Sequence, residues 1–463
     1  MNKVYICFLF IATLFTTISC STEVEHEIAQ VASPTLVSTT PVTGTSGIQS
    51  GNVTISLTYD KNVFFASKNK DLLSISNDGS IVSADVIGSS PTLVVVVNCP
   101  SRNTTYTFSV PEGLVTGPNS MPAPAVEISF TTQGLDNTPV NTLTAEAQRV
   151  YDFLQETYEQ KTISGMMANV AWNVEESEQV YQWTGKYPAL NCFDYIHLQS
   201  SAEGSWIDYG DITPVSQWWN NGGLVAAMWH WNVPTSNGSG NLTTYKDQTS
   251  FDIDNAFTEG TWEYQTVNAD LEKIAGYLKL LKDANIPVIW RPLHEAAGGW
   301  FWWGKNADSF KRLWIQMFDY FKAQGLDNLI WVWTTETGDA DWYPGDEYVD
   351  IVGRDLYGND AADCASQYQT VVSEYGSKMV ALSECGAYID TNSKLGLLSE
   401  QWNAGARWLW FMPWYDNDGA ALSHADKEWW QDAMSQSYVI TRDQLPSFTL
   451  IPQHYYKYNF LST

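Results

Sequence analysis

Eight short apolar runs, separated by segments of helical periodicity, constrain the fold of residues 145–463 most strongly. Apolar residues recur at helical spacing in Leu271-Ile274-Leu278-Leu281 and in Phe310-Leu313-Met317-Phe321. Alternating strands and helices predict a parallel sheet, and eight β/α units fit a closed (β/α)8 barrel, the TIM barrel. The expected strands are 162–168, 188–195, 223–232, 287–295, 328–335, 350–357, 379–386 and 407–414.

Polar and aromatic residues stand at the ends of separate expected strands. A TIM barrel carries its chemistry at the carboxyl ends of its strands, so we expect these side chains to share one pocket. An isolated polar residue at a strand end would mean little, but a set in register is more informative. The residues are Asp194, His230, Glu295, Tyr357, Glu384 and Trp410.

Two glutamates at the ends of expected strands four and seven suggest a reaction. One stands in Arg291-Pro-Leu-His-Glu295, followed by the aromatic run Trp300-Phe-Trp-Trp-Gly304, and the other in Ser383-Glu384-Cys-Gly386. Facing carboxylates of this kind cleave bonds between sugars, one as proton donor and the other as nucleophile. The apolar flank predicts a raised pKa for Glu295 and therefore the acid's role, which leaves Glu384 as nucleophile. Tryptophan faces would stack on the sugar rings.

Simpler interpretations exist for each residue taken alone. A single glutamate at a strand end is usually solvated or ion-paired, and a single histidine such as His230 usually sits satisfied in the core. The histidines and carboxylates lack metal-ligand spacing such as HExxH, and the sequence contains neither a phosphate loop nor a dinucleotide fingerprint. We therefore expect no metal and no cofactor.

The motifs resemble those of glycoside hydrolase family 26 over about residues 145–460. The resemblance rests on Arg291-Pro-Leu-His-Glu295 with Gly298-Gly-Trp300-Phe-Trp-Trp-Gly304, and on three further segments. Those segments are Cys192-Phe-Asp194-Tyr195, Trp229-His230-Trp-Asn232-Val-Pro234 and Val352-Gly-Arg-Asp355-Leu-Tyr357-Gly. That family consists mostly of β-1,4-mannanases with a retaining (β/α)8 fold.

The resemblance also implies a role for each matching residue. Glu295 would be the acid/base and Glu384 the nucleophile, with Tyr357 donating a hydrogen bond to Glu384. Arg291 and Asp355 would hold the surroundings of the nucleophile. His230 and His294 would contact the sugar in the −1 subsite, Trp300 would line the acid's side of the cleft, and Trp410 would form the −1 platform.

The sequence departs from the family at Ala296-Ala297, where a larger pair is common, and the platform is chosen from three neighbouring tryptophans. The resemblance implies hydrolysis of β-1,4-mannan, glucomannan or galactomannan. β-1,3-Xylan or mixed-linkage β-glucan remain alternative substrates, and a surface glycan-binding protein without catalysis is the alternative class. The Gly/Ser/Asn/Thr-rich insertion 235–261 predicts a mobile loop beside the cleft.

Residues 33–133 differ in composition from the rest. They contain no tryptophan and alternate with period two, as in Val53-Ile55-Leu57-Tyr59, Tyr106-Phe108-Val110 and Val126-Ile128-Phe130. This pattern predicts a small β-sandwich, which resembles bacterial immunoglobulin-like domains. A polar linker, 134–144, separates it from the catalytic domain 145–463. A spacer is the expected role of the sandwich, with carbohydrate binding as the alternative.

The amino terminus has the features of an export signal. Lys3 precedes a mostly apolar stretch, and Thr17-Ile-Ser-Cys20 resembles a bacterial lipoprotein box. Residues 1–20 are the expected signal, with Cys20 as the lipidated residue, and 21–32 an acidic tether. We expect a monomer anchored to the outer membrane, at the cell surface or alternatively at the periplasmic face. The charge of −28 argues against nucleic acid as a partner.

Overall fold

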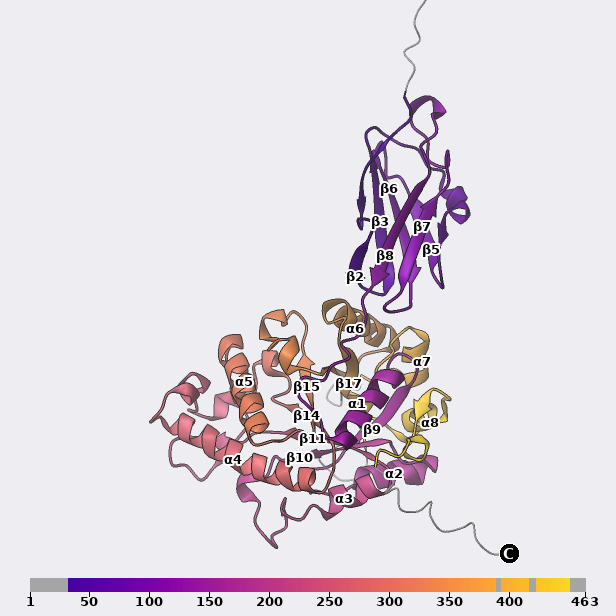
Figure 1. Cartoon of the computed structure of the whole chain (residues 1–463). Coiled ribbons are helices and arrows are strands. Elements are labelled where there is room, and N and C mark those ends of the chain that lie inside the picture. Colours follow the sequence, from indigo (N-terminus) through magenta and orange to yellow (C-terminus); the bar gives the residue numbers. More distant parts are fainter. Residues whose placement is uncertain (1–31, 389–392, 416–421, 450–463) are drawn as a thin grey trace, which may run out of the picture. The chain divides into compact units, whose positions relative to one another are not determined.

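The computed structural model describes residues 32–388, 393–415 and 422–449 (Figure 1). The predicted signal, Cys20 and nearly all of the acidic tether lie outside these residues. The described chain divides into two compact units. One contains most of the amino-terminal β-sandwich, and the other contains the barrel.

The amino-terminal unit is a sandwich of two sheets. Strands that the sequence predicted by alternation bury every second side chain, as in β3, where Ile55 and Leu57 are fully buried. The prediction of an all-β immunoglobulin-like sandwich is confirmed. One sheet has the order β1 (Leu36–Thr40), β3 (Gly51–Tyr59), β6 (Thr92–Cys99), β5 (Ser80–Asp85), and the other β2 (Thr45–Ile48), β8 (Val126–Thr132), β7 (Thr105–Val110), β4 (Ser74–Ile75).

The second unit is a closed barrel of eight parallel strands, as predicted. Each strand pairs with the next, and β18 pairs with β9 to close the ring, because Trp410 lies opposite Ile163. Every residue of the first four strands is buried, which matches strands covered on both faces. In chain order the strands are β9 (Thr162–Met167), β10 (Leu190–Asp194), β11 (Leu224–Trp229), β14 (Val288–Pro292), β15 (Leu329–Thr335), β16 (Ile351–Tyr357), β17 (Met379–Gly386) and β18 (Trp410–Pro413).

Helices lie around the barrel strands (Figure 1). The two helical patterns noted in the sequence fall in α4 and α5, and all eight of those apolar residues are buried. The helices are α1 (Ala145–Thr157), α2 (Glu175–Thr184), α3 (Thr213–Asn220), α4 (Trp262–Asp283), α5 (Ala307–Ala323), α6 (Ala361–Glu374), α7 (Leu398–Asn403) and α8 (Lys427–Ser435).

The expectation of eight complete β/α units is wrong at the fifth. Between β15 and β16 the chain forms only two 3-10 helices, η8 (Ala340–Trp342) and η9 (Asp346–Tyr348). Helix α1, which precedes the barrel, packs beside β15. The connection contains Gly338, Pro344 and Gly345, residue types that disfavour a continuous helix.

The insertion 235–261 is more ordered than its composition predicted. It begins within a short hairpin of β12 (Val233–Pro234) and β13 (Leu242–Thr243) and continues through 3-10 helices η4 (Lys246–Gln248) and η5 (Ile253–Phe257). Backbone hydrogen bonds tie it to the segment after β14: Lys246 N–H donates to the Trp300 carbonyl, and Trp302 N–H to that of Thr244. These bonds fix the insertion beside the aromatic run.

Cys99, Cys192, Cys364 and Cys385 are buried. No helix among the described residues is long and apolar enough to cross a membrane.

Candidate active site

Glu295 lies on a tight turn beyond its strand. The sequence predicted that the strand ends at Glu295, but β14 ends at Pro292. Leu293 and Glu295 both adopt left-handed backbone, each with φ +51°. This conformation is costly for residues with a side chain and is concentrated at functional sites. The turn is therefore a locally strained feature that sets the position of the Glu295 carboxyl group.

The aromatic run after Glu295 braces this turn. The Trp303 indole N–H donates to the His294 carbonyl at 2.9 Å. Trp302 and Trp303 are fully buried, whereas Trp300 is 42% exposed. A Cβ at Gly298 would lie 2.1 Å from the Trp300 ring, so only glycine lets that ring lie against the backbone. The motif thus supports the turn from beneath and presents one tryptophan to solvent.

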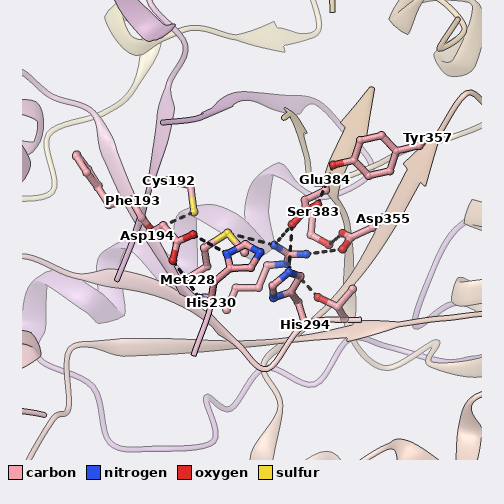
Figure 2. Close-up of polar contacts among 12 residues, drawn as sticks. Cys192, Phe193, Asp194, Met228, His230, His294, Asp355, Tyr357, Ser383 and Glu384 are labelled. Carbon is pink, nitrogen blue, oxygen red and sulfur yellow. Dashed lines mark hydrogen bonds and ion pairs between the residues drawn. The ribbon is translucent and has the colours of Figure 1, made fainter. Parts of the chain in front are cut away.

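Glu384 is held by two donors at the end of β17 (Figure 2). The Arg291 guanidinium donates to its Oε1 at 2.7 Å, and the Tyr357 hydroxyl donates to its Oε2 at 2.9 Å. Glu384 and Arg291 are almost completely buried. Charge-assisted hydrogen bonds of this kind stabilise the ionised carboxylate and fix its orientation.

Asp355 lies on the other side of the same arginine. Arg291 Nη2 donates to Asp355 Oδ2, and the Ser383 hydroxyl donates to Oδ1 at 2.7 Å. Burial raises the pKa of Asp355, and the Arg291 charge opposes that rise. A Cβ at Gly353 would lie 2.3 Å from the Ser383 hydroxyl oxygen, so glycine there leaves room for this bond. Arg291 therefore bridges two carboxylates.

The spacing of the carboxylates separates two mechanisms. One oxygen from each of Glu295, Asp355 and Glu384 lies within 4.8 Å of the others. Retaining glycosidases hold their two carboxyl groups ~5–5.5 Å apart, whereas inverting enzymes need ~6.5–9.5 Å to admit a water. Burial, reinforced by the negative charge of Glu384, raises the pKa of Glu295 well above its usual range. The spacing of the Glu295 and Glu384 carboxyl groups therefore fits the retaining arrangement, and the raised pKa of Glu295 favours its protonated form.

Two histidines complete the floor of the site. His230 Nδ1 lies 2.6 Å from Asp194 Oδ2, and its backbone N–H donates to Asp194 Oδ1 at 3.0 Å. Burial works against protonation of His230, but the Asp194 carboxylate raises its pKa overall. Burial and the neighbouring charges of His230 and Arg291 hold the pKa of His294 well below its usual value. Asp194 thus directs Nε2 of His230 away from itself, and His294 is neutral.

The prediction of Trp410 as the platform is wrong. Trp410 is the first residue of β18, is 2% exposed, and pairs with Ile163 near the start of β9. It therefore lies two to three residues, or roughly 7–10 Å, below the level of Glu384. Trp414 follows the strand, and its ring centroid is 5.7 Å from that of His230. Trp414, not Trp410, is the tryptophan at the mouth of the barrel.

The sequence reading gave no role to several residues that contact this cluster. Thr334 accepts a hydrogen bond from Arg291 Nε at 3.0 Å, and the Met228 sulfur lies 3.7 Å from Nη1. Asp194 was expected in the shared pocket but without a partner, and Ser383 was noted only as the neighbour of Glu384. Thr334 and Asp194 each stand one residue before the end of an expected strand, which was a signal available in the sequence, whereas Ser383 and Met228 lie deeper within theirs.

The three clustered carboxylates are also the set that could hold a cation among the described residues. The Arg291 guanidinium already donates to two of them, Asp355 and Glu384. A divalent cation would have to share those oxygens with a fixed positive charge. The donor set is therefore better suited to proton chemistry than to metal binding.

We expect Arg291→Met to lower the free energy of unfolding by about 3–5 kcal/mol, because it leaves two buried carboxylates without their cation. Urea unfolding followed by tryptophan fluorescence measures the change. The control is Arg312→Met on α5, whose exposed guanidinium lies 4.0 Å from the Phe257 ring centroid and whose loss is expected to cost less than about 1 kcal/mol. Equal effects of the two substitutions would contradict this account of Arg291.

Comparison with known families divides the chain in the same way as the fold. Residues 140–444 match the family model described as Glycosyl hydrolase family 26. Residues 30–132 match the model described as a bacterial Ig-like domain. The first match covers the barrel strands and both glutamates.

Curated relatives carry mannanase names. Mannan endo-1,4-beta-mannosidase B of Piromyces sp is 34% identical over 319 residues, which are 67% of this chain and 53% of that protein. Mannan endo-1,4-beta-mannosidase of Thermothelomyces thermophilus is 34% identical over 314 residues, 65% of this chain and 61% of that protein. The chain thus spans little more than half the length of these relatives.

Solved structures extend the similarity. The family 26 domain of an endo-beta-mannanase/endo-beta-glucanase from Prevotella bryantii is 40% identical, with a TM-score of 0.64 over 67% of this chain and 100% of that one. A beta-mannanase from a symbiotic protist of the termite Reticulitermes speratus, complexed with gluco-manno-oligosaccharide, is 36% identical, with a TM-score of 0.59 over 68% and 98% of the two chains. The chain belongs to glycoside hydrolase family 26.

Proposed function

We propose that this protein is a retaining glycoside hydrolase that cleaves β-1,4-mannosidic bonds in mannan, glucomannan or galactomannan. The observation that carries the mechanism is the spacing of Glu295 and Glu384, whose nearest oxygens lie within 4.8 Å. The substrate follows from the mannanase names of the relatives and from family membership.

In the first step, an oxygen of the Glu384 carboxylate attacks the anomeric carbon of the sugar in the −1 subsite. Glu295 donates its proton to the glycosidic oxygen as the bond from that oxygen to the anomeric carbon breaks. The leaving sugar departs with that proton, and a covalent glycosyl ester remains on Glu384. Arg291 and Tyr357 orient Glu384 for attack.

In the second step, the now ionised Glu295 removes a proton from water. The water oxygen attacks the anomeric carbon, the ester bond to Glu384 breaks, and Glu384 leaves as a carboxylate. Two inversions at one carbon give net retention. Glu295 regains its proton, so the enzyme returns to its starting state.

Three side chains would hold the reacting sugar between the carboxylates. Trp414 offers a ring face at the carboxyl end of β18, and His230 presents Nε2 because Asp194 occupies Nδ1. His294 lies with Nε2 3.9 Å from Glu384 Oε1. Trp300, which is partly exposed and follows Glu295, would lie on the leaving-group side.

The experiment that tests this function is reducing-sugar release from linear β-1,4-mannan, galactomannan, β-1,3-xylan and mixed-linkage β-glucan. The assay uses residues 21–463, which begin after Cys20, and compares the wild-type sequence with Glu295→Ala and Glu384→Ala. Turnover of mannan that both substitutions abolish supports the proposal. Turnover of xylan or glucan alone would keep the mechanism and overturn the substrate. Glycan binding without turnover would support a binding protein instead.

Trp414→Ala is expected to lower kcat/KM on mannan by about ten-fold or more, because a large aromatic contact with the sugar is lost. Trp410→Phe is the contrasting substitution, since Trp410 is 2% exposed and lies in the core. It should reduce thermal stability and leave KM unchanged. Steady-state kinetics and thermal unfolding of both variants test the assignment, which fails if Trp410→Phe raises KM and Trp414→Ala does not.

For location, we propose a lipid anchor at Cys20 in the outer membrane, based on Thr17-Ile-Ser-Cys20 and the acidic residues that follow. In a bacterial host that processes lipoproteins, the wild type should incorporate labelled palmitate and sediment with outer membranes. Cys20→Ala should abolish both properties. Protease treatment of intact cells distinguishes the surface from the periplasmic face, and an unlabelled wild type would contradict the anchor.

A further inference from the structure

Glu336 is an acidic residue at the mouth of the barrel that the catalytic mechanism does not use. It directly follows β15, the fifth barrel strand, whose last residue is Thr335. This strand stands between β14, which leads to Glu295, and β16, which carries Asp355. The Glu336 side chain is partly exposed. Its position is therefore at the same end of the barrel as the candidate active site.

The backbone around Glu336 is clamped from two sides. Asp339 accepts a hydrogen bond from the Glu336 N–H at 2.6 Å and another from the Thr335 hydroxyl at 2.7 Å. On the other side, the buried Arg354 guanidinium donates to the Thr335 carbonyl at 3.0 Å and to the Thr337 hydroxyl at 2.5 Å. A turn fixed by this many bonds presents its side chain in a set direction, which is the requirement for a binding residue.

The clamp uses the backbone of Glu336 and leaves its carboxylate unoccupied. Among the described residues, nothing donates a hydrogen bond to that carboxylate, and no cation lies within ion-pair distance of it. The Glu336 carboxylate nonetheless interacts electrostatically with Glu295, Glu384 and Arg291. Its other charged neighbours are Arg354 and Asp339. Burial raises the pKa of Glu336. A half-buried acceptor without a partner, close to the reacting groups, is a costly arrangement unless a ligand supplies the donor.

The position of Glu336 around the barrel indicates which part of the ligand it would meet. Trp414 follows the eighth strand and His230 the third, with ring centroids 5.7 Å apart, so in the proposed function they would flank the sugar that Glu384 attacks. Glu336 follows the fifth strand, three strands away from the eighth in a ring of eight and next to the strand that leads to the proton donor. The proton donor must lie next to the leaving group. The end of the fifth strand, which is beside the proton donor, is therefore expected to line the part of the site that holds the leaving group.

We propose that Glu336 is a specificity residue for the leaving-group sugar: its carboxylate accepts a hydrogen bond from a ring hydroxyl of the sugar in the +1 subsite. This inference rests on the proposed function and deepens it. It assigns to the fifth strand a contact that favours a carbohydrate leaving group over any other. It also gives a reason for the clamp, which holds the acceptor in place before substrate arrives.

The test compares two substrates that differ only in what leaves. Mannohexaose leaves a sugar in the +1 subsite, whereas 2,4-dinitrophenyl β-mannobioside leaves a phenolate without hydroxyls. Glu336→Gln should lower kcat/KM for mannohexaose by about ten-fold, the expected effect of weakening one charged hydrogen bond. For the aryl substrate kcat/KM should be unchanged. Glu336→Asp, which retains the charge but withdraws the carboxylate, should also lose activity on mannohexaose.

Glu347→Gln is the matched control, because Glu347 is an exposed glutamate on η9 of the same connection. It should behave as wild type on both substrates. Binding of mannohexaose, measured by calorimetry in the Glu384→Ala background, should also weaken about ten-fold on adding Glu336→Gln. This readout does not depend on proton transfer and would not respond to a purely electrostatic effect on Glu295.

Two results would overturn the inference. The first is that the ratio of kcat/KM for mannohexaose to kcat/KM for the aryl substrate is the same in Glu336→Gln as in the wild type, which would show that Glu336 does not contact the leaving-group sugar. A loss confined to the alkaline limb of the pH profile, with binding unchanged, would make Glu336 a charge that acts through Glu295 and not a binding residue. The wild type distinguishes failure of the proposed function from failure of this inference. A wild type that is inactive on both substrates contradicts the proposed function and this inference with it. An active wild type whose ratio of kcat/KM between the two substrates equals that of Glu336→Gln contradicts the inference alone.

Discussion

Glu384→Ala is expected to lower kcat on mannan by on the order of 10⁴-fold or more, because no other group can form the covalent bond to the sugar. KM should change little, since the side chains that would hold the sugar remain in place. Reducing-sugar assays at high enzyme concentration measure the residual rate, and calorimetry with mannohexaose shows that substrate still binds.

The control for Glu384→Ala is Glu374→Ala, an exposed glutamate at the end of α6 that should retain full activity. Thermal unfolding of both variants is needed, because Glu384 is one of two carboxylates bound to the buried Arg291. A folded Glu384→Ala variant that keeps more than a small fraction of wild-type kcat would rule out its role as nucleophile.

Glu295→Ala is expected to lower kcat/KM on mannan by roughly 10²–10⁴-fold, the usual contribution of a general acid. The loss should be much smaller for 2,4-dinitrophenyl β-mannobioside, because that leaving group departs without a proton. Wild-type kcat/KM on mannan should fall as pH rises through the raised pKa of Glu295, since the acid must be protonated. Comparison of both substrates over a range of pH measures these effects.

Comparison of the two substrates also shows which result would contradict the role of Glu295. If Glu295→Ala lost activity equally on mannan and on the aryl substrate, Glu295 would not be the proton donor. Glu336→Gln should retain the alkaline limb that Glu295→Ala lacks, which separates the acid from its acidic neighbour.

The barrel strands were predictable because buried parallel strands leave continuous apolar runs that helical segments separate. The expected range 379–386 coincides with β17, and 350–357 differs from β16 by one residue. The first residue past a run is also easy to identify, which is why Glu384 and Tyr357 were placed at the mouth of the barrel. The family resemblance, not periodicity, supplied the individual roles.

The platform tryptophan could not be chosen from the pattern. Trp410 and Trp414 are an even number of residues apart, so the two-residue period of a strand assigns them to the same face. Only the point at which β18 ends, at Pro413, distinguishes a core residue from one at the mouth. Strand ends depend on hydrogen bonds to neighbouring strands, which a single sequence does not state.

The turn at Glu295 and the role of Glu336 were hidden for related reasons. Leu293 and Glu295 adopt left-handed backbone that their residue types disfavour, so local propensity points away from it. Glu336 follows a predicted strand, but what singles it out is the clamp by Asp339 and Arg354 and a carboxylate left without a donor. Both features arise from contacts between distant segments.

The central claim, that Glu295 and Glu384 work as a retaining pair, is tested most directly by the anomer of the first product. Proton NMR during the first minutes of mannohexaose hydrolysis distinguishes the newly formed β-anomer from the α-anomer before mutarotation mixes them. The carboxylate spacing within 4.8 Å predicts that the β-anomer appears first. Initial release of the α-anomer would mean inversion and would contradict the assignment of Glu384 as nucleophile.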